Sequence, residues 1–519
     1  MRLVTKNNPQ GFTRLLFSLP VLAVWLLLTL VSGVGAQEVL RVAREDEPLA
    51  LRPDHPLSLA DQDFLRNVTE GLTRIDSEGN VQPGIAERWQ VNEEGTVYTF
   101  YLRESTWSDG TTLTAKDVVN SWKRLGEEAR MPLQDFYGIT RYEKFHQRDG
   151  KFEDTGIRLV DDRTLEVTLG KPDPYFIHKL AQPYFAPFKE VEEEGQEEVI
   201  LNGPYQFQES EDEELLLVKN DHYWRKDQVA LSRIHYKRVT EDERPPISEL
   251  DYIAPELLHY FREDLPEKEI QSQPLAATCW LKVNVTHDLT SNLDLRKALS
   301  LAVDRQTLVR EFEGLHLKPT TQLVPSLVTG FEEEQSYIDD GNVAAAKNFY
   351  KKSLEELGGD SDPLALTLIL REDAVEERLA EWLKASWEEH LEVSIQLQVL
   401  SDKKYLETLE NGDYHLALAG WLASRDDPLE FLEMYATDDS GNNDTGWYNQ
   451  SYYQLIDELK RSKDVKERVT LARNAEALLM QERPIIPLFN YSVNYWARHG
   501  FEHLEPNAFY HLDLSQVSH

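Results

Sequence analysis

Few residues in this sequence have the types and the spacing that catalysis requires. Ser401-Asp402-Lys403-Lys404 matches the S-x-x-K pattern of some serine nucleophiles, but so short a pattern often arises by chance and here precedes an ordinary helix. The segment Asp438–Asp444 hints at a calcium loop, yet it lacks the spaced ligands and the terminal glutamate. The 14 histidines are scattered, and G-x-S-x-G, H-E-x-x-H and phosphate-binding glycine motifs are missing from the sequence. We therefore expect no catalytic residue, no metal and no cofactor.

The single cysteine, Cys279, lies in the apolar run Thr278–Leu281. One cysteine cannot form a disulfide within the chain. Its apolar neighbours predict an inert, buried thiol.

The charge balance is strongly acidic. The chain has 92 Asp and Glu against 55 Lys and Arg, a net charge of −37. Nucleic acids and anionic membrane surfaces need basic patches, so neither is an expected partner. The excess of acid permits cationic ligands, although a solvated acidic surface is the simpler interpretation. The hydrophobic content of 41% is that of a globular protein.

The N-terminus has the pattern of a secretory signal. Three basic residues precede the apolar run Leu15–Val31, and small residues follow it up to Ala36. We predict a signal peptide over residues 1–36 that is cleaved after Ala36. An uncleaved anchor is the alternative, because the apolar run is nearly long enough to span a bilayer. No cysteine follows the run, so a site for an N-terminal lipid is not expected, and a periplasm is the natural compartment.

The stretch Glu70–Lys123 is dense in local signals. Gly, Asn and Asp clusters mark turns, alternation marks a strand, and Thr114 followed by Asp117 marks a helix start. In order, we predict a turn at 76–80, a short helix over 85–89, a turn at 92–95, a strand over 96–102, a turn at 107–110 and a helix capped by Thr114.

Later segments alternate between strand and helix. Residues 364–370 and 393–400 are apolar, strand-like runs, and the segments 341–357 and 375–391 have helical periodicity. Residues 293–305 are predicted to form one further helix. Such alternation is typical of an α/β lobe with a mostly parallel core.

Five sequence words occur in order within Glu70–Lys123: EGL, AERW, FYLRE, WSDGTTLTAKDV and SWKRL. With PDPYF at 172–176 and the run ERPIIPLF at 482–489, they closely resemble the large periplasmic solute-binding proteins that serve peptide ABC transporters, the oligopeptide- and dipeptide-binding family. The resemblance covers the whole chain after the signal, with weak patches at 126–150, 186–200 and 240–275.

The resemblance implies an α/β, two-lobed periplasmic binding protein-like fold of class C, with an extra α/β domain inserted in the first lobe. Lobe 1 would be discontinuous and comprise residues 37–69, 198–274 and 486–519. The extra domain would comprise residues 70–197, and lobe 2 residues 275–485.

The resemblance also implies a ligand site between the lobes, where a peptide is held as an added strand. By position, the loop from Leu57 to Leu59 would supply backbone pairing, and Tyr137 would line a pocket. Trp421, Leu422 and Ala423 would face the ligand from the second lobe. The oligopeptide-binding branch reads W-x-A-D-Y here, and its Asp binds the free α-amino group of the ligand.

This chain departs from that branch at two positions. Ser424 stands at the place of the anchoring acid, and Leu418 at the place of an arginine. A hydroxyl cannot give the charge-assisted hydrogen bond of a carboxylate. Asp426 or Asp427 is a candidate substitute for the acid, but Asp427 precedes a proline and is expected to cap the next helix.

The implied function is capture of a small peptide or peptide-like ligand and its delivery to an inner-membrane ABC permease, by a monomer without enzymatic activity. Two alternatives remain open. One is a non-peptide solute receptor of the same fold, and the other is a periplasmic chaperone or sensor.

Overall fold

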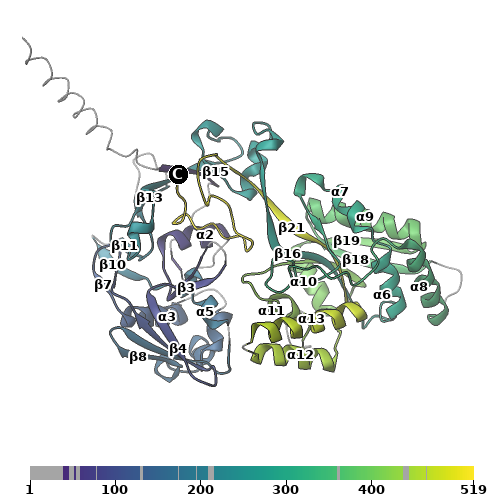
Figure 1. Ribbon diagram of the computed structural model, residues 1–519, viewed down its shortest axis with the longest axis horizontal. Coiled ribbons are helices and arrows are strands. Elements are labelled where there is room, and N and C mark those ends of the chain that lie inside the picture. Colours follow the sequence, from purple (N-terminus) through teal and green to yellow (C-terminus); the bar gives the residue numbers. More distant parts are fainter. Residues whose placement is uncertain are drawn as a thin grey trace, which may run out of the picture.

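The computed structural model describes residues 39–45, 52–53, 59–76, 79–128, 133–173, 175–193, 196–208, 215–358, 363–436, 443–462 and 464–519. Figure 1 shows two bodies of mixed helices and strands, joined by the long strands β16 and β21. The first body holds the elements before β16 and the C-terminal segment, and the second holds α6 to α13. Within the described residues, no helix is both long and apolar enough to span a bilayer. The predicted signal peptide, residues 1–36, lies outside them.

One sheet of eleven strands, counted over the described residues, runs through both bodies. β1 pairs in parallel with β14 and β15, and β18 pairs in parallel with β19 and β20. The parallel pairing predicted around β18 is therefore confirmed, while β16, β20 and β21 pair antiparallel. In spatial order the strands are β12 (Tyr205–Gln208), β13 (Leu215–Lys219), β14 (Arg233–Val239), β1 (Val39–Glu45), β15 (Tyr252–Ile253), β21 (Ile485–Ala497), β16 (Gln271–Val283), β20 (Leu416–Leu422), β18 (Ala365–Arg371) and β19 (Ser394–Leu400), with β17 (Lys318–Pro319) beside β21.

The first body has a hydrophobic core around α2 (Leu59–Val68). Phe64, Leu65 and Val68 of α2 are each at most 3% exposed. They pack with residues of β1, β13 and β14 and with the C-terminal segment, which contributes the buried Val517. Four 3₁₀ helices complete this part: η4 (Lys226–Gln228), η5 (Ile247–Glu249), η6 (Pro255–Phe261) and η7 (Glu267–Glu269).

Residues 73–200 form a smaller unit within the first body. Its antiparallel sheet has the order β4 (Ala86–Val91), β5 (Val97–Leu102), β9 (Thr164–Thr168), β8 (Ile157–Asp161), and α3 (Ala115–Glu128) contributes Val118 and Trp122 to the same core. The remaining elements are β2 (Thr73–Ile75), β3 (Val81–Pro83), β6 (Ser105–Thr106), β7 (Thr112–Leu113), η1 (Gln134–Gly138), α4 (Tyr142–His146), η2 (Phe152–Asp154), α5 (Phe176–Lys179), η3 (Pro183–Phe185), β10 (Lys189–Glu193) and β11 (Gln196–Ile200).

One predicted element in this unit is wrong. Residues 85–89 are not a helix, because Ala86–Val91 is strand β4 and pairs with β5. The register shifts between Ala86 and Arg88, and such a bulge turns Ala86 and Trp89 to the same side of the strand. The apolar residues Ala86 and Trp89 are therefore three positions apart in the sequence, a spacing that is also typical of a helix. The start of α3 is as predicted, since the Asp117 carboxylate accepts the Thr114 N–H at 2.7 Å.

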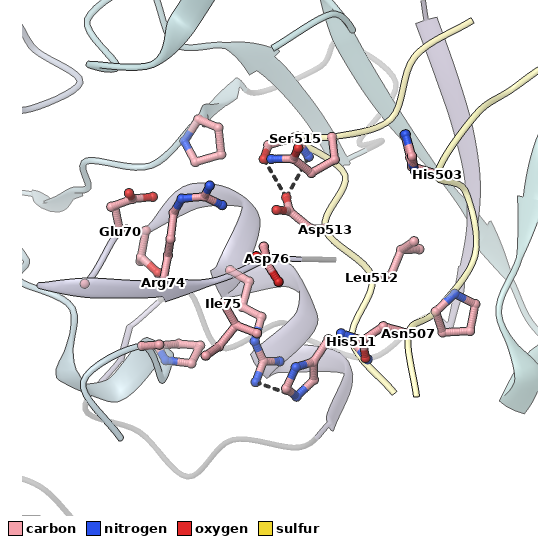
Figure 2. Close-up of a pocket in the computed structure, with 18 of the residues that line it drawn as sticks. Glu70, Arg74, Ile75, Asp76, His503, Asn507, His511, Leu512, Asp513 and Ser515 are labelled. Atoms are coloured by element: carbon pink, nitrogen blue, oxygen red, sulfur yellow. Dashed lines mark hydrogen bonds between the residues drawn. The ribbon is translucent and has the colours of Figure 1, made fainter. Parts of the chain in front are cut away.

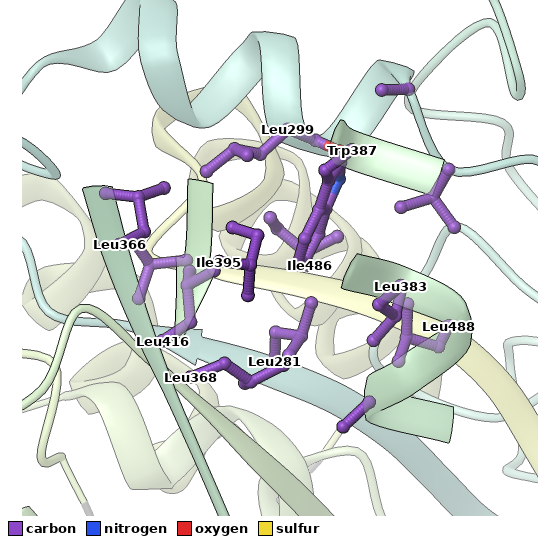
Figure 3. Close-up of a cluster of buried hydrophobic side chains, with 14 of the residues drawn as sticks. Leu281, Leu299, Leu366, Leu368, Leu383, Trp387, Ile395, Leu416, Ile486 and Leu488 are labelled. Atoms are coloured by element: carbon purple, nitrogen blue, oxygen red, sulfur yellow. The ribbon is translucent and has the colours of Figure 1, made fainter. Parts of the chain in front are cut away.

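The second body has its largest hydrophobic cluster between the sheet and the helices α6 (Leu293–Leu301), α8 (Val343–Glu356) and α9 (Ala374–Leu391). In Figure 3, Leu281, Leu368 and Leu416 of the strands approach Leu299 and Trp387 of the helices. The other elements are α7 (Arg305–Arg310), η8 (Glu313–Leu315), α10 (Asp402–Asn411), α11 (Leu429–Leu432), η9 (Glu433–Tyr435), α12 (Gln450–Arg461) and α13 (Val465–Glu482).

The helix predicted over 293–305 is shorter than expected. It ends at Leu301, and Asp304 begins α7 by accepting the Thr307 N–H at 3.0 Å. A short acidic side chain before a helix is a strong cap, so the chain starts a new helix there.

The strands β16 and β21 pair along most of their length and connect the two bodies (Figure 1). Their register shifts between Pro274 and Thr278, and again between Cys279 and Trp280, which lies opposite Pro487. Proline has no N–H to donate, which interrupts a ladder at such positions. Cys279 is a buried free thiol whose pKa is raised to about 12 by burial, so the predicted inert thiol is confirmed.

Candidate functional site

Strand β20 leads from the core of the second body to an exposed tryptophan. Leu416, Ala417 and Leu418 are buried, whereas Gly420 is exposed and Trp421 is 40% exposed. Large apolar side chains in such a position are informative, because burial is their normal state. Ala423, two residues further on, is fully buried again.

Trp421 lines three cavities. The largest, of about 1,230 Å³, lies between the two bodies. Trp89, Tyr98 and Ile177 of the first body line it on one side, and Trp421 and Tyr453 of the second body on the other. Two cavities of about 870 and 450 Å³ adjoin the same tryptophan on the second body. We call these three cavities together the cleft.

One edge of β20 is open inside the cleft. β16 pairs with β20 from Leu416 to Leu422, but β18 pairs only with Leu416 and Ala417. Among the described strands, none pairs with the second edge of β20 beyond Ala417, although the Tyr405 hydroxyl donates to the Leu418 carbonyl. An open edge offers main-chain N–H and C=O groups to an extended ligand.

Ser424, at the position of the missing acid, is bound to a glutamate from the next helix. The Glu430 Oε2 atom accepts both the N–H and the hydroxyl of Ser424 at 2.9 Å. Its other oxygen lies 2.5 Å from an Arg425 nitrogen. Glu430 thus places a carboxylate beside residue 424, which sequence reasoning missed because six residues separate the two positions.

The two neighbouring aspartates are also engaged. Asp426 accepts the N–H of Thr329 at 2.6 Å and its hydroxyl as well. Asp427 accepts the Leu429 N–H at 2.8 Å at the start of α11, although the N-cap position of that helix is Pro428 and not Asp427 as predicted. It also lies 2.5 Å from Arg468.

A contact between the bodies reaches this segment. Tyr175, from the first body, is 8% exposed and packs in a hydrophobic cluster of the second. The Arg425 guanidinium lies 4.0 Å from its ring centre, and Arg468 donates to its hydroxyl at 2.5 Å. Burial and the nearby Arg425 charge lower the pKa of His178, three residues on, to about 4, so this histidine stays neutral.

The remaining predicted site residues lie elsewhere or outside the described part. Leu57 lies outside the described residues, and Leu59 begins α2. Tyr137 is in η1 and packs against the core of the 73–200 unit, with its ring 6.1 Å from that of His146. Leu422 lines the smallest of the three cavities beside Trp421. Trp421 and Leu422 therefore line the cleft, and Ser424 is bonded to Glu430, which also lines it. Ala423, Asp426 and Tyr137 do not line any of the three cavities.

A separate cavity of about 300 Å³ lies where the C-terminal segment packs on α2 and β2 (Figure 2). Some of its polar groups bond to one another: Glu70 accepts from Tyr223 at 2.8 Å, and Asp513 accepts the Ser515 N–H at 3.0 Å. Others, the Arg74 Nε, His511 Nδ1 and Gln516 Nε2 atoms, are buried without a hydrogen-bond partner among the described residues. Burial raises the pKa of Glu70.

Ligands for a metal ion do not gather in the described part of the chain. No group of three or more His, Cys, Asp or Glu side chains there could hold one. Most of the Asp438–Asp444 segment lies outside that part.

The sequence matches a family model over residues 80–443, described as bacterial extracellular solute-binding proteins, family 5. The oligopeptide-binding protein OppA of Bacillus subtilis (strain 168) is 29% identical over 477 residues, 87% of each chain. The dipeptide-binding protein DppE of the same organism is 30% identical over 480 residues, 88% of each chain.

A solved structure has the same fold. The periplasmic murein tripeptide-binding protein MppA, in its unliganded open form, superposes with a TM-score of 0.79 at 24% identity, covering 93% of this chain and 97% of the other. The α/β, two-lobed architecture is thereby confirmed. With the family model covering more than half of its length, this chain belongs to the family 5 bacterial extracellular solute-binding proteins.

Proposed function

We propose that this chain is the substrate-binding component of an ABC importer, which captures peptides or peptide-like solutes in the cleft and delivers them to an inner-membrane permease. One observation carries the proposal: the open edge of β20 borders the cleft, and its exposed Trp421 lines the cavity between the two bodies. Main-chain pairing to such an edge suits any peptide sequence, and aromatic walls suit varied side chains. The printed names of the relatives point to the same class of ligand.

The two bodies act as lobes in this proposal. Lobe 1 comprises residues 37–69, 198–274 and 486–519, with the extra domain at 70–197, and lobe 2 comprises residues 275–485. Separate hydrophobic clusters in these regions support the division, except that Ile486, Leu488 and Phe489 pack in the cluster of lobe 2. Ligand between the lobes stabilises the closed arrangement, and this shift of population is what the permease recognises.

The proposed setting is a periplasm. The chain reaches it through the signal at 1–36, which is cleaved and leaves no lipid, and acts there as a monomer. The proposed role is binding without catalysis, as fits a family of solute-binding proteins.

The test is native mass spectrometry of the purified protein, followed by denaturation and identification of what is released. Release of short peptides, together with a rise in melting temperature when a mixed peptide pool is added, is the expected result. A single non-peptide compound would keep the fold and overturn the peptide assignment. An empty protein that no peptide stabilises would favour the chaperone or sensor alternative.

A further inference from the structure

Almost all charged residues of the second body that line the cleft form ion pairs with one another. Of the described residues of this body that line the three cavities, five are cations and six are anions. Each of the five cations is paired with one of the six anions. Of these eleven described residues, only Glu410, an exposed residue of α10, forms no ion pair with another of them. The pairs are Arg425–Glu430 at 2.5 Å, Lys460–Glu433 at 2.5 Å, Arg461–Asp457 at 2.7 Å, Arg371–Glu376 at 3.5 Å and Lys282–Asp444.

Two of these pairs are largely shielded from solvent. The side chains of Arg425 and Glu430 are 15% and 7% exposed, and those of Lys282 and Asp444 are 11% and 21% exposed. Lys282 lines the cavity of about 870 Å³ and Glu430 the one of about 1,230 Å³, and both cavities share Trp421. A ligand over Trp421 therefore lies between two shielded pairs that are each neutral.

The Arg425–Glu430 pair is held by its neighbours, although the buried Arg425 Nε atom has no hydrogen-bond partner within the described part of the chain. A carboxylate accepts about four hydrogen bonds, and Glu430 already receives two from Ser424 and the Arg425 ion pair. Arg425 in turn lies over the ring of Tyr175. A charged ligand group that took either partner would leave the other charge buried and unpaired, which is strongly unfavourable.

The opposite wall does not supply a shielded charge either. Among the described residues of the first body that line the inter-body cavity, the charged ones are Glu93, Glu94 and Lys171, and all three are exposed. Charges in contact with water are screened and contribute little to binding.

We infer that the part of the ligand that lies over Trp421 is uncharged, as in a peptide whose amino and carboxyl ends are blocked. The inference rests on the proposed function and names the class of ligand within it. Apolar contact with Trp421 and main-chain hydrogen bonds to the edge of β20 select this ligand, and neither needs a charge.

The experiment compares one synthetic pool of random tetrapeptides in four forms: free ends, N-acetylated, C-amidated, and both. Each form is incubated with the full protein, and the retained peptides are counted by mass spectrometry after ultrafiltration. We expect the doubly blocked pool to be retained at least as well as the free pool, with a less than twofold change between 0.05 and 0.5 M salt.

Two single variants make the inference sharper because they shift preference in opposite directions. Arg425→Gln leaves the Glu430 carboxylate unpaired and is expected to favour pools with a free amino end about tenfold. Glu430→Gln leaves the Arg425 cation unpaired and is expected to favour pools with a free carboxyl end. The double variant is expected to retain pools with free and with blocked ends equally well, as the wild-type protein does. General damage to the fold would lower retention of all four pools together and would leave their ratios unchanged.

The outcomes separate the two proposals. If the wild-type protein retains the free pool at least tenfold better than the blocked pools, peptide capture stands and the inference of an uncharged ligand is overturned. If none of the four pools is retained, peptide capture itself fails, and the inference fails with it.

Discussion

Glu476 shows how one buried residue sets the pH dependence of stability. Its side chain is fully buried and accepts the N–H groups of Leu323 and Val324 at 2.9 and 2.8 Å. The Tyr337 hydroxyl donates to its other oxygen at 2.9 Å. Burial raises the pKa of Glu476 from 4.5 to about 7. The native state therefore holds a proton that the unfolded chain releases near pH 4.5.

We predict that Glu476→Gln flattens the pH dependence of unfolding. The stabilisation from the protonated carboxyl is complete below pH 4.5 and is lost as the pH rises through about 7, a change on the order of 3 kcal/mol. Glutamine keeps an oxygen for the two backbone N–H groups and can donate its amide N–H to the Tyr337 hydroxyl, without ionising, so the variant gains free energy of unfolding relative to wild type above pH 7. Urea titrations at pH 5 and 8 measure this, with Glu381→Gln on the exposed face of α9 as control. An equal pH slope in wild type and variant would contradict it.

Trp421 is the residue on which ligand affinity should depend most. We predict that Trp421→Ala weakens binding of a co-purified ligand at least about tenfold, since buried tryptophans dominate binding interfaces. Calorimetry with the released compound measures the effect. Tyr448→Ala is the matched control, because Tyr448 is also an exposed aromatic residue of the second body, at 53%, but does not line the cleft. Equal losses in both variants would show that Trp421 has no special role.

The candidate site was only partly predictable at the residue scale. Trp421 and Leu422 could be proposed from the resemblance of their neighbours. The carboxylate of Glu430 beside Ser424 could not, because it depends on how the chain turns between residues 424 and 430. Tyr175 meets Arg468 across 293 positions of sequence, and no local pattern carries such information.

At the scale of elements, local signals predicted structure where each residue acted through its neighbours. The turn at 92–95 and the cap of α3 are examples, since turn chemistry decides the first and a side chain three residues away decides the second. The predicted helix at 85–89 failed because its partner strand, β5, supplies a pairing and a bulge that the segment cannot reveal alone. Long-range pairing outweighs a weak helical period.

The cap of α3 gives a test at this scale. We predict that Asp117→Ala lowers the free energy of unfolding by about 1 kcal/mol, because the Thr114 N–H loses its acceptor. Thermal and urea unfolding monitored by circular dichroism measure the change. Asp117→Asn should recover most of it, since the amide oxygen still accepts a hydrogen bond. A variant as stable as wild type would mean that water replaces the cap without cost.

For the whole molecule, the long pair β16 and β21 lets the bodies move without separating. A solved neighbour of the same fold is described as an unliganded open form. We predict that a captured ligand lowers the radius of gyration, because it bridges the walls of the cleft. Small-angle scattering with and without the released compound measures this. At the same ligand concentration, the Trp421→Ala variant is expected to keep its larger radius of gyration. If this variant also closed, closure would not depend on the Trp421 side chain.

The thiol of Cys279 can report the opening of the sheet at the junction of the two bodies. The thiol is buried beside the register shift of β16 and β21, and its pKa of about 12 keeps it protonated. A thiol reagent can modify it only when this part of the sheet opens. At high reagent concentration, the rate of modification therefore measures the rate of this opening, and the experiment needs neither a label nor a mutation. Closure of the two bodies on a ligand should lower the rate at which Cys279 is modified.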